Sequence, residues 1–168
     1  MIINILIGLV VIIVVFVIIV ATRPDDFRIT RMATMPAPPG KVFPLVAILK
    51  TWEVWSPWAK LDPNAKIIYE GPAAGTGAIM RWSGNKKVGE GRMTIIEGRP
   101  SDLIRIKLEF FKPFKATNAA EFTFKPEGNQ TAVTWSMFGK NNFMSKAFGL
   151  FMNCDKMVGG DFERVWRQ

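Results

Sequence analysis

The segment LIRIKLEFF, residues 103–111, has the clearest alternation of apolar and charged side chains in this chain of 168 residues. The two alternating sets are Ile104, Ile106, Leu108 and Phe110, and Arg105, Lys107 and Glu109. A period of two residues predicts a β-strand with one buried and one solvated face, which is typical of an antiparallel sheet.

The same alternation recurs on both sides of this segment. Phe122 and Phe124 alternate with polar residues, and so do Val133, Trp135 and Met137. Glycine, proline and asparagine separate the apolar segments, as expected for turns. We therefore predict seven strands, at residues 27–35, 66–70, 78–82, 89–97, 103–111, 118–125 and 131–138.

Helical spacing is found in two further segments. Val42, Val46 and Leu49 share one helical face, and Pro44 predicts that this helix starts near Lys41 or is distorted, because proline fits only the first turn of a helix. A long last helix is predicted from Asn142 to about Arg167. Its inner stripe, at helical spacing, comprises Phe148, Phe151, Asp155, Val158, Phe162 and Val165.

The chain begins with an uncharged apolar segment, IINILIGLVVIIVVFVIIVA, residues 2–21. A helix of about 20 such residues spans the hydrocarbon core of a bilayer. A cleaved signal peptide and a buried core helix are the alternatives, but the segment is too long for the first and the chain too small to surround the second. We predict a transmembrane anchor at residues 1–22 and one domain at residues 23–168.

Charge predicts the orientation and one partner. Arg23, Arg28 and Arg31 follow the apolar segment and nothing basic precedes it, so the domain is expected on the cytoplasmic side of a single-pass protein of the cytoplasmic membrane. The net charge of +8 lies entirely beyond residue 22. Anionic head groups are the expected partner, rather than nucleic acid, because no nucleic-acid motif is present; a mildly basic solvated face is the alternative.

Two residue counts restrict the chemistry. The single cysteine, Cys154, excludes an internal disulfide, and the absence of histidine excludes Ser-His-Asp and Cys-His nucleophiles and histidine-ligated metal sites. No cofactor or metal is expected. Among the carboxylates, Asp155 is the one weak catalytic candidate, because its place on the inner stripe of the last helix predicts burial.

In order and spacing, several motifs resemble the START/Bet v 1-like (SRPBCC) superfamily, and most closely its bacterial membrane-anchored polyketide cyclase/dehydrase and lipid-transport type. They are Ala37-Pro38-Pro39 with Val42-Phe43, Trp55-Ser56-Pro57-Trp58, residues 84–89 (GNKKVG) and residues 155–163 (DKMVGGDFE). The resemblance implies an α+β helix-grip fold, in which a curved antiparallel sheet of about seven strands surrounds the long C-terminal helix and an apolar cavity.

The strand alternation and this resemblance together predict a ligand-binding set. The expected lining residues are Trp55, Trp58, Met80, Trp82, Met93, Ile106, Leu108, Phe110, Phe122, Phe124, Val133, Trp135, Met137, Phe151, Met152 and Val158. Methionine and aromatic side chains adapt to irregular apolar ligands, although an inward stripe of this kind also fills ordinary cores. Trp55 and Trp58 are predicted to gate the cavity or to pack as a plug under the first helix.

The segment at residues 110–115 mixes aromatic and basic residues at a predicted hairpin tip. Phe111, Lys112, Phe114 and Lys115 are expected to contact the membrane, with rings at the acyl boundary and ammonium groups on phosphates. The alternative is a hairpin whose phenylalanines fold inward.

Three functions compete. The first is a membrane-tethered protein that binds a hydrophobic, lipid-like or isoprenoid-like molecule. The second is an accessory or structural subunit of a larger membrane protein complex, with Asn4 and Gly8 marking a helix–helix contact. The third, a cyclase or dehydratase that uses Asp155, is the weakest because no paired-carboxylate motif is present.

Overall fold

The computed structural model describes residues 2–141 and 143–151 of the chain. Its helical elements are α1 (Ile2–Ala21), α2 (Pro39–Ala47), η1 (Leu49–Thr51), α3 (Trp52–Trp55), η2 (Pro57–Lys60) and α4 (Phe143–Phe151). Its strands are β1 (Asp26–Met35), β2 (Lys66–Glu70), β3 (Ile79–Ser83), β4 (Glu90–Arg99), β5 (Leu103–Lys112), β6 (Ala116–Glu127) and β7 (Gln130–Lys140).

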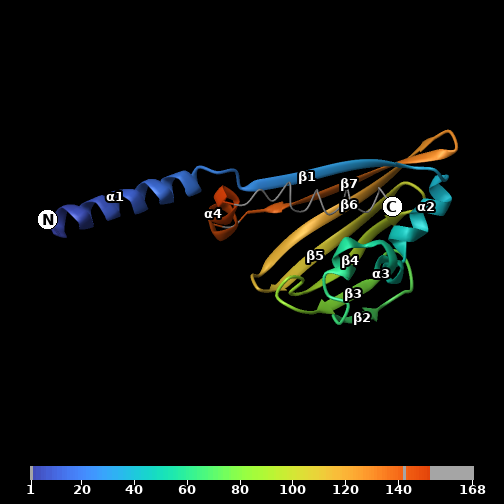
Figure 1. The fold of residues 1–168 in the computed structure, drawn as a ribbon. Coiled ribbons are helices and arrows are strands. Elements are labelled where there is room, and N and C mark those ends of the chain that lie inside the picture. Colours follow the sequence, from blue (N-terminus) through green and yellow to red (C-terminus); the bar gives the residue numbers. More distant parts are fainter. Residues whose placement is uncertain (1, 142, 152–168) are drawn as a thin grey trace.

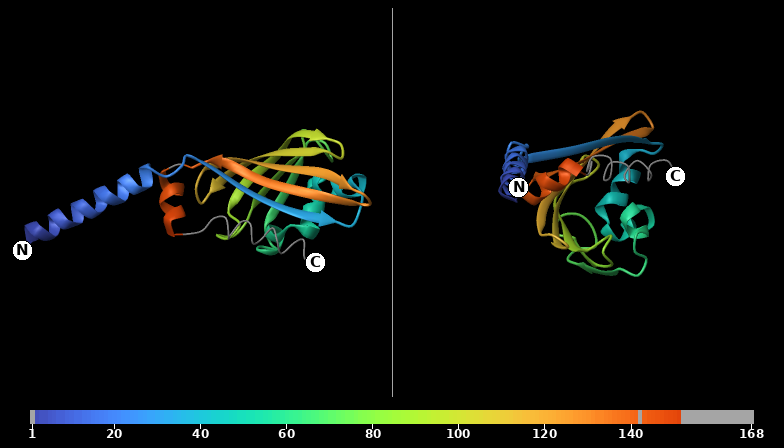
Figure 2. Two further views of the ribbon diagram at one scale, coloured as in Figure 1. Left: turned by 90° about the horizontal axis from the view of Figure 1, so that it is seen from above. Right: turned by 60° about the vertical axis from the view of Figure 1, so that its left-hand side comes forward.

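The seven strands form one antiparallel sheet in the order β1-β7-β6-β5-β4-β3-β2. The first and second strands of the chain are therefore the two edges of the sheet. The segment from α2 to η2 crosses from one edge to the other, and the sheet curves around the side on which these short helices lie (Figures 1 and 2). This arrangement confirms the predicted α+β class with a curved antiparallel sheet.

Strand register places the predicted apolar residues on one face. Trp135 lies opposite Phe122, which lies opposite Ile104, and all three are at most 3% exposed. Met93 lies opposite Leu108 in the next pair of strands. The alternation in residues 103–111 therefore does define an inner face, and the predicted strand boundaries differ from the observed ones by at most two residues at either end.

The outer face carries rows of ion pairs between strands. Arg105 of β5 contacts Glu97 of β4 at 2.5 Å and Glu121 of β6 at 2.8 Å. Hydrogen bonds from Lys107 and Arg92 hold the pKa of the Glu109 carboxyl below its usual range. The carboxylates of Glu97, Glu109 and Glu121 therefore form cross-strand ion pairs on the solvated face.

Helix α2 starts earlier than the sequence predicts, at Pro39, and continues through Pro44. Pro39 occupies the first turn, where a proline costs nothing because the first amide groups have no helical acceptor. Pro44 cannot donate to the carbonyl of Gly40, but the helix has only nine residues and regains a bond when Ile48 N–H donates to the Pro44 carbonyl at 3.0 Å. Of the predicted last helix, the structure describes α4, and residues 152–168 lie outside the described part.

Gly89 and Gly128 allow a matched test of the close packing between the β3–β4 turn and the end of β5. Both have positive φ, at +64° and +62°, so alanine strains the backbone equally at the two sites. A Cβ on Gly89 would lie 2.2 Å from the Lys112 carbonyl oxygen, whereas a Cβ on Gly128 meets nothing within 4 Å. We expect Gly128→Ala to lower the free energy of unfolding by about 1 kcal/mol and Gly89→Ala by about 3 kcal/mol.

Denaturant unfolding of the full chain in detergent measures both values. Equal losses in the two variants would contradict the close approach of the β3–β4 turn to the end of β5.

Candidate functional site

The inner face of the sheet is apolar along nearly its whole length and packs against α2 and α3. Val42, Val46 and Trp52 of the helical segment belong to the same buried cluster as the inward residues of the sheet. The Phe43 ring meets Phe124 edge-on at 5.4 Å, and the Trp52 ring meets Phe122 at 5.8 Å. The helical segment therefore covers part of the inner face through aromatic contacts.

The large inward side chains are less buried toward one end of the sheet, although Met35, at the other end of β1, is also partly buried. We call the end where β1 follows α1 the anchored end; it also contains the end of β7, the β5–β6 turn and the β3–β4 turn. Inward residues away from it, such as Val133 and Ile104, are 0% exposed. Inward residues near it are only partly buried, namely Phe27, Trp82, Leu108, Phe110 and Met137. Apolar surface is therefore accessible on the inner face at the anchored end.

Arg31 is the only charged residue at an inward position of the seven strands, all of which the structure describes. It lies opposite Trp135, and its Nη1 donates to the Thr30 carbonyl at 2.9 Å. Its Nε is shielded from solvent. The alternation of residues 27–35 already indicated the inward position of Arg31, because Arg31 follows Phe27 and Ile29 at intervals of two. The sequence prediction nevertheless did not include Arg31 among the site residues.

The tryptophan-rich segment is tied to α2 by two indole hydrogen bonds. Trp52 Nε1 donates to the Val46 carbonyl at 3.1 Å, and Trp55 Nε1 donates to the Leu45 carbonyl at 2.9 Å. The rings of Trp52 and Trp55 lie 4.7 Å apart. Trp52, 6% exposed, enters the inner face, whereas Trp55 and Trp58 are partly buried beside it. The gating role of Trp55 and Trp58 stays a prediction.

Trp52 was not among the expected lining residues, although the sequence contained a signal for it. It continues the apolar spacing of Val42, Val46 and Leu49 by three more residues. All four residues belong to the buried cluster. The signal was obscured because the backbone changes from α2 to the short η1 and α3 helices between Ala47 and Trp52.

The other predicted site residues fall into three groups. Six are inward and buried or nearly so: Met80, Met93, Ile106, Phe122, Phe124 and Trp135. Phe111, Lys112, Phe114 and Lys115 are exposed around the β5–β6 turn. Phe151 ends α4, and its side chain, Met152, Asp155 and Val158 lie outside what the structure describes. The first two groups thus occupy the places that the sequence predicts, and the binding roles of all three stay predictions.

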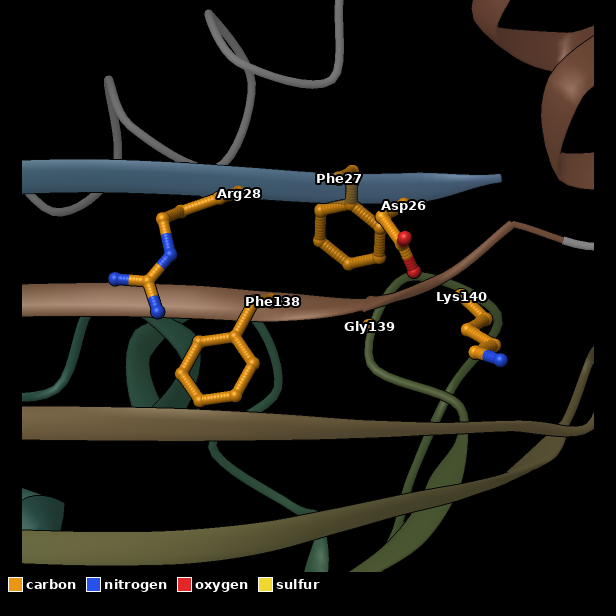
Figure 3. Close-up of a pocket in the computed structure, with 6 residues that line it drawn as sticks. All are labelled: Asp26, Phe27, Arg28, Phe138, Gly139 and Lys140. Atoms are coloured by element: carbon orange, nitrogen blue, oxygen red, sulfur yellow. The ribbon is translucent and has the colours of Figure 1, made fainter. Parts of the chain in front are cut away.

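Two pockets lie at the anchored end and are lined by residues of the strands and of the β5–β6 turn. One, of about 480 Å³, lies at the start of β1 and the end of β7, and Figure 3 shows its lining residues Asp26, Phe27, Arg28, Phe138, Gly139 and Lys140. The Arg28 guanidinium lies 4.6 Å from the centre of the Phe138 ring. The other, of about 300 Å³, is lined by Glu109, Phe110, Phe111, Lys115, Ala116 and Thr117. Both pockets combine aromatic rings with basic side chains.

Solved structures with a similar fold include protein MLL2253 from Mesorhizobium loti, with a TM-score of 0.59 and 14% identity over 84% of this chain and 95% of that one. Protein Mll3558 from Rhizobium loti gives a TM-score of 0.58 and 19% identity over 84% and 96%. The allergen-type structure Ara h 8.0201 gives 0.57 and 11% over 84% and 95%. At such identities these likenesses show the fold, which is the Bet v 1-like helix-grip fold.

Neither a family model nor a curated protein matches the sequence. The fold is shared by proteins with many activities, so a function has to be argued from the residues of this chain.

Tyr69 provides a test of how α3 is fixed to the edge strand β2. Its hydroxyl donates to Glu53 Oε1 at 2.6 Å, and partial burial followed by this hydrogen bond and the Glu53 charge raises the pKa of Tyr69 well above its usual range. It is the only tyrosine of the chain, so tyrosinate absorbance reports on it alone. We expect Glu53→Gln to lower the pKa of Tyr69, while Glu70→Gln, which removes a neighbouring exposed carboxylate, has little effect.

The sign of the stability effect follows from the raised pKa. Unfolded Tyr69 ionises near pH 10 while folded Tyr69 keeps its proton, so the free energy of unfolding falls as the pH rises above about 10. The contribution is complete below that pH, and the fall is expected to be shallower in Glu53→Gln. Identical titrations of the parent protein and Glu53→Gln would show that the pair is absent in solution.

Proposed function

We propose that this chain is a membrane-anchored carrier that binds a hydrophobic, lipid-like molecule against the inner face of its sheet. One observation carries the proposal: the accessible apolar part of the inner face lies at the anchored end, next to α1. Apolar, methionine- and aromatic-rich concave surfaces are the usual environment of hydrophobic ligands. The helix-grip fold supports the proposal, since Bet v 1-like proteins commonly bind hydrophobic ligands.

The anchor is supported by the properties of α1. It is the one helix among the described residues that is long and apolar enough to span a bilayer, with a mean hydropathy of 3.5 in its most apolar window. Apart from Phe16 and Val20, its residues from Ile2 to Ala21 are exposed. A contiguous apolar surface of this size is stable in lipid rather than in water.

Its orientation is proposed from the flanking charges. Arg23 and Arg28 follow the helix closely, and both are exposed. Because basic flanks stay on the cytoplasmic side, we place the sheet in the cytoplasm of a single-pass protein of the inner membrane.

Mass spectrometry of an organic extract from the full chain, purified in mild detergent, tests the carrier function. We expect a lipid-like molecule in near-stoichiometric amount. Leu108→Trp adds bulk to the accessible part of the inner face and is expected to weaken binding about tenfold, the equivalent of about 1.4 kcal/mol of overpacking.

The matched control is Lys107→Trp, which places the same ring on the outer face of β5, one residue away. It is expected to retain the extracted molecule. Extracts without such a molecule, or equal losses in Leu108→Trp and Lys107→Trp, would contradict binding at the inner face.

An accessory role in a membrane protein complex is the second candidate, and α1 supplies the observation that favours it. Asn4 and Gly8 are one helical turn apart, both are exposed, and a Cβ on Gly8 would meet nothing within 4 Å. Small and polar residues at this spacing allow close packing between transmembrane helices. We expect Gly8→Leu to abolish a stoichiometric partner in mild-detergent purification if this role is correct, and Ile12→Leu to retain it.

A further inference from the structure

The two ends of the sheet differ in charge although both consist of exposed turns. At the anchored end, residues 22–28, 61–66, 84–90, 110–116 and 140–146 contain nine basic and four acidic residues. At the opposite end, residues 35–41, 70–77, 98–103 and 125–131 contain three of each. Much of the net charge of the chain is therefore gathered where the sheet meets α1.

Exposed basic and aromatic side chains occur together at the anchored end. We call the following set the basic rim: Lys86, Lys87, Lys112, Lys115, Lys140, Phe111, Phe114 and Phe143. All five lysines are exposed, and the phenylalanines are 38%, 58% and 48% exposed, respectively. Rings at the acyl boundary beside ammonium groups at phosphate level are the combination that binds a membrane surface.

Contacts between α1, α4 and the link that precedes β1 fix the position of the basic rim along the axis of α1. Val20, in the last turn of α1, is 0% exposed, and α1 contacts α4. The Lys146 ammonium of α4 pairs with Asp25, which holds the pKa of that carboxyl below its usual range. The Asn141 N–H donates to the Asp25 carbonyl at 2.6 Å. The last turn of α1 is thus packed directly against the domain (Figure 1).

The connection between α1 and β1 is too short for the domain to lie far from the bilayer. Four residues separate Ala21 from Asp26, and such a segment spans at most about 17 Å when fully extended. The head-group layer is itself about 5–8 Å thick on each side of the hydrocarbon core. With α1 in the membrane, the anchored end of the sheet therefore lies at or near the head groups.

We propose that the basic rim docks on anionic phospholipid head groups of the leaflet from which α1 emerges. This inference rests on the proposed membrane anchor. Docking directs the accessible apolar part of the inner face toward the bilayer, so that a lipid-like molecule passes between membrane and protein with little exposure to water. The Lys112 ammonium pairs with Glu90 at 2.7 Å, and its side chain is still 73% exposed.

Hydrogen exchange of the full chain in nanodiscs tests the docking. Discs of phosphatidylcholine alone are compared with discs that also contain phosphatidylglycerol. We expect the anionic lipid to slow exchange at residues 84–90 and 110–117 about fivefold or more, the equivalent of one lysine near a charged surface. Residues 98–103 and 127–130, at the opposite end, serve as internal controls and should not change.

A pair of matched variants identifies the side chains responsible. Lys112→Gln with Lys115→Gln is expected to abolish the lipid-dependent protection at residues 110–117. Lys41→Gln with Lys125→Gln removes two exposed lysines from the opposite end and should retain it.

The outcomes separate the anchor from the docking. A chain that does not co-elute with the nanodiscs contradicts the membrane anchor and the docking with it. If the chain co-elutes but exchanges equally in both lipid compositions, the docking is overturned. The same follows if both double variants lose the lipid-dependent protection equally. Either result leaves the anchor and the carrier function in place.

Discussion

The register of β5 against its two neighbours is the constraint on which the rest of the structure depends. It places Ile104, Ile106 and Leu108 on the inner face and Arg105 in ion pairs on the outer face. A shift by one residue would move the whole apolar set into water and bury three charges, so this register is strongly specified. The inner face, its covering helices and the accessible apolar end all follow from it.

The curvature of the sheet makes its inner face concave (Figure 2). The segment from α2 to η2 joins these edges and inserts Trp52 over Phe122, while the Tyr69–Glu53 hydrogen bond holds α3 to β2. One end of the inner face is therefore closed by aromatic packing. At the anchored end, where α1 and α4 meet, the large inward apolar residues are partly exposed. The two ends of the strands therefore differ in how well the inner face is covered.

Much of the fold could be predicted because the strands show a short-range alternation of apolar and polar residues. The strands from β1 to β7 were predicted within two residues of their ends, since each apolar alternation extends over at least one full strand. At α2 the proline was expected to place the helix start near Lys41 or to distort the helix, and the observed start at Pro39 lies two residues earlier. Trp52 was missed because three short helices interrupt the spacing. Trp52 continues the apolar spacing of the preceding helix only across these interruptions, and its packing against Phe122 of the sheet makes it part of the buried cluster.

For the candidate site, the sequence by itself determined which residues point inward and that an uncharged apolar helix precedes the sheet. Alternation and hydropathy are properties of neighbouring residues, so they are readable without a structure. Only the tertiary structure decided that Arg31 lies directly opposite Trp135, and that residues as far apart in the sequence as Lys86 and Phe143 form one basic rim beside α1. Such proximity depends on strand order and curvature, which are set by contacts between distant segments.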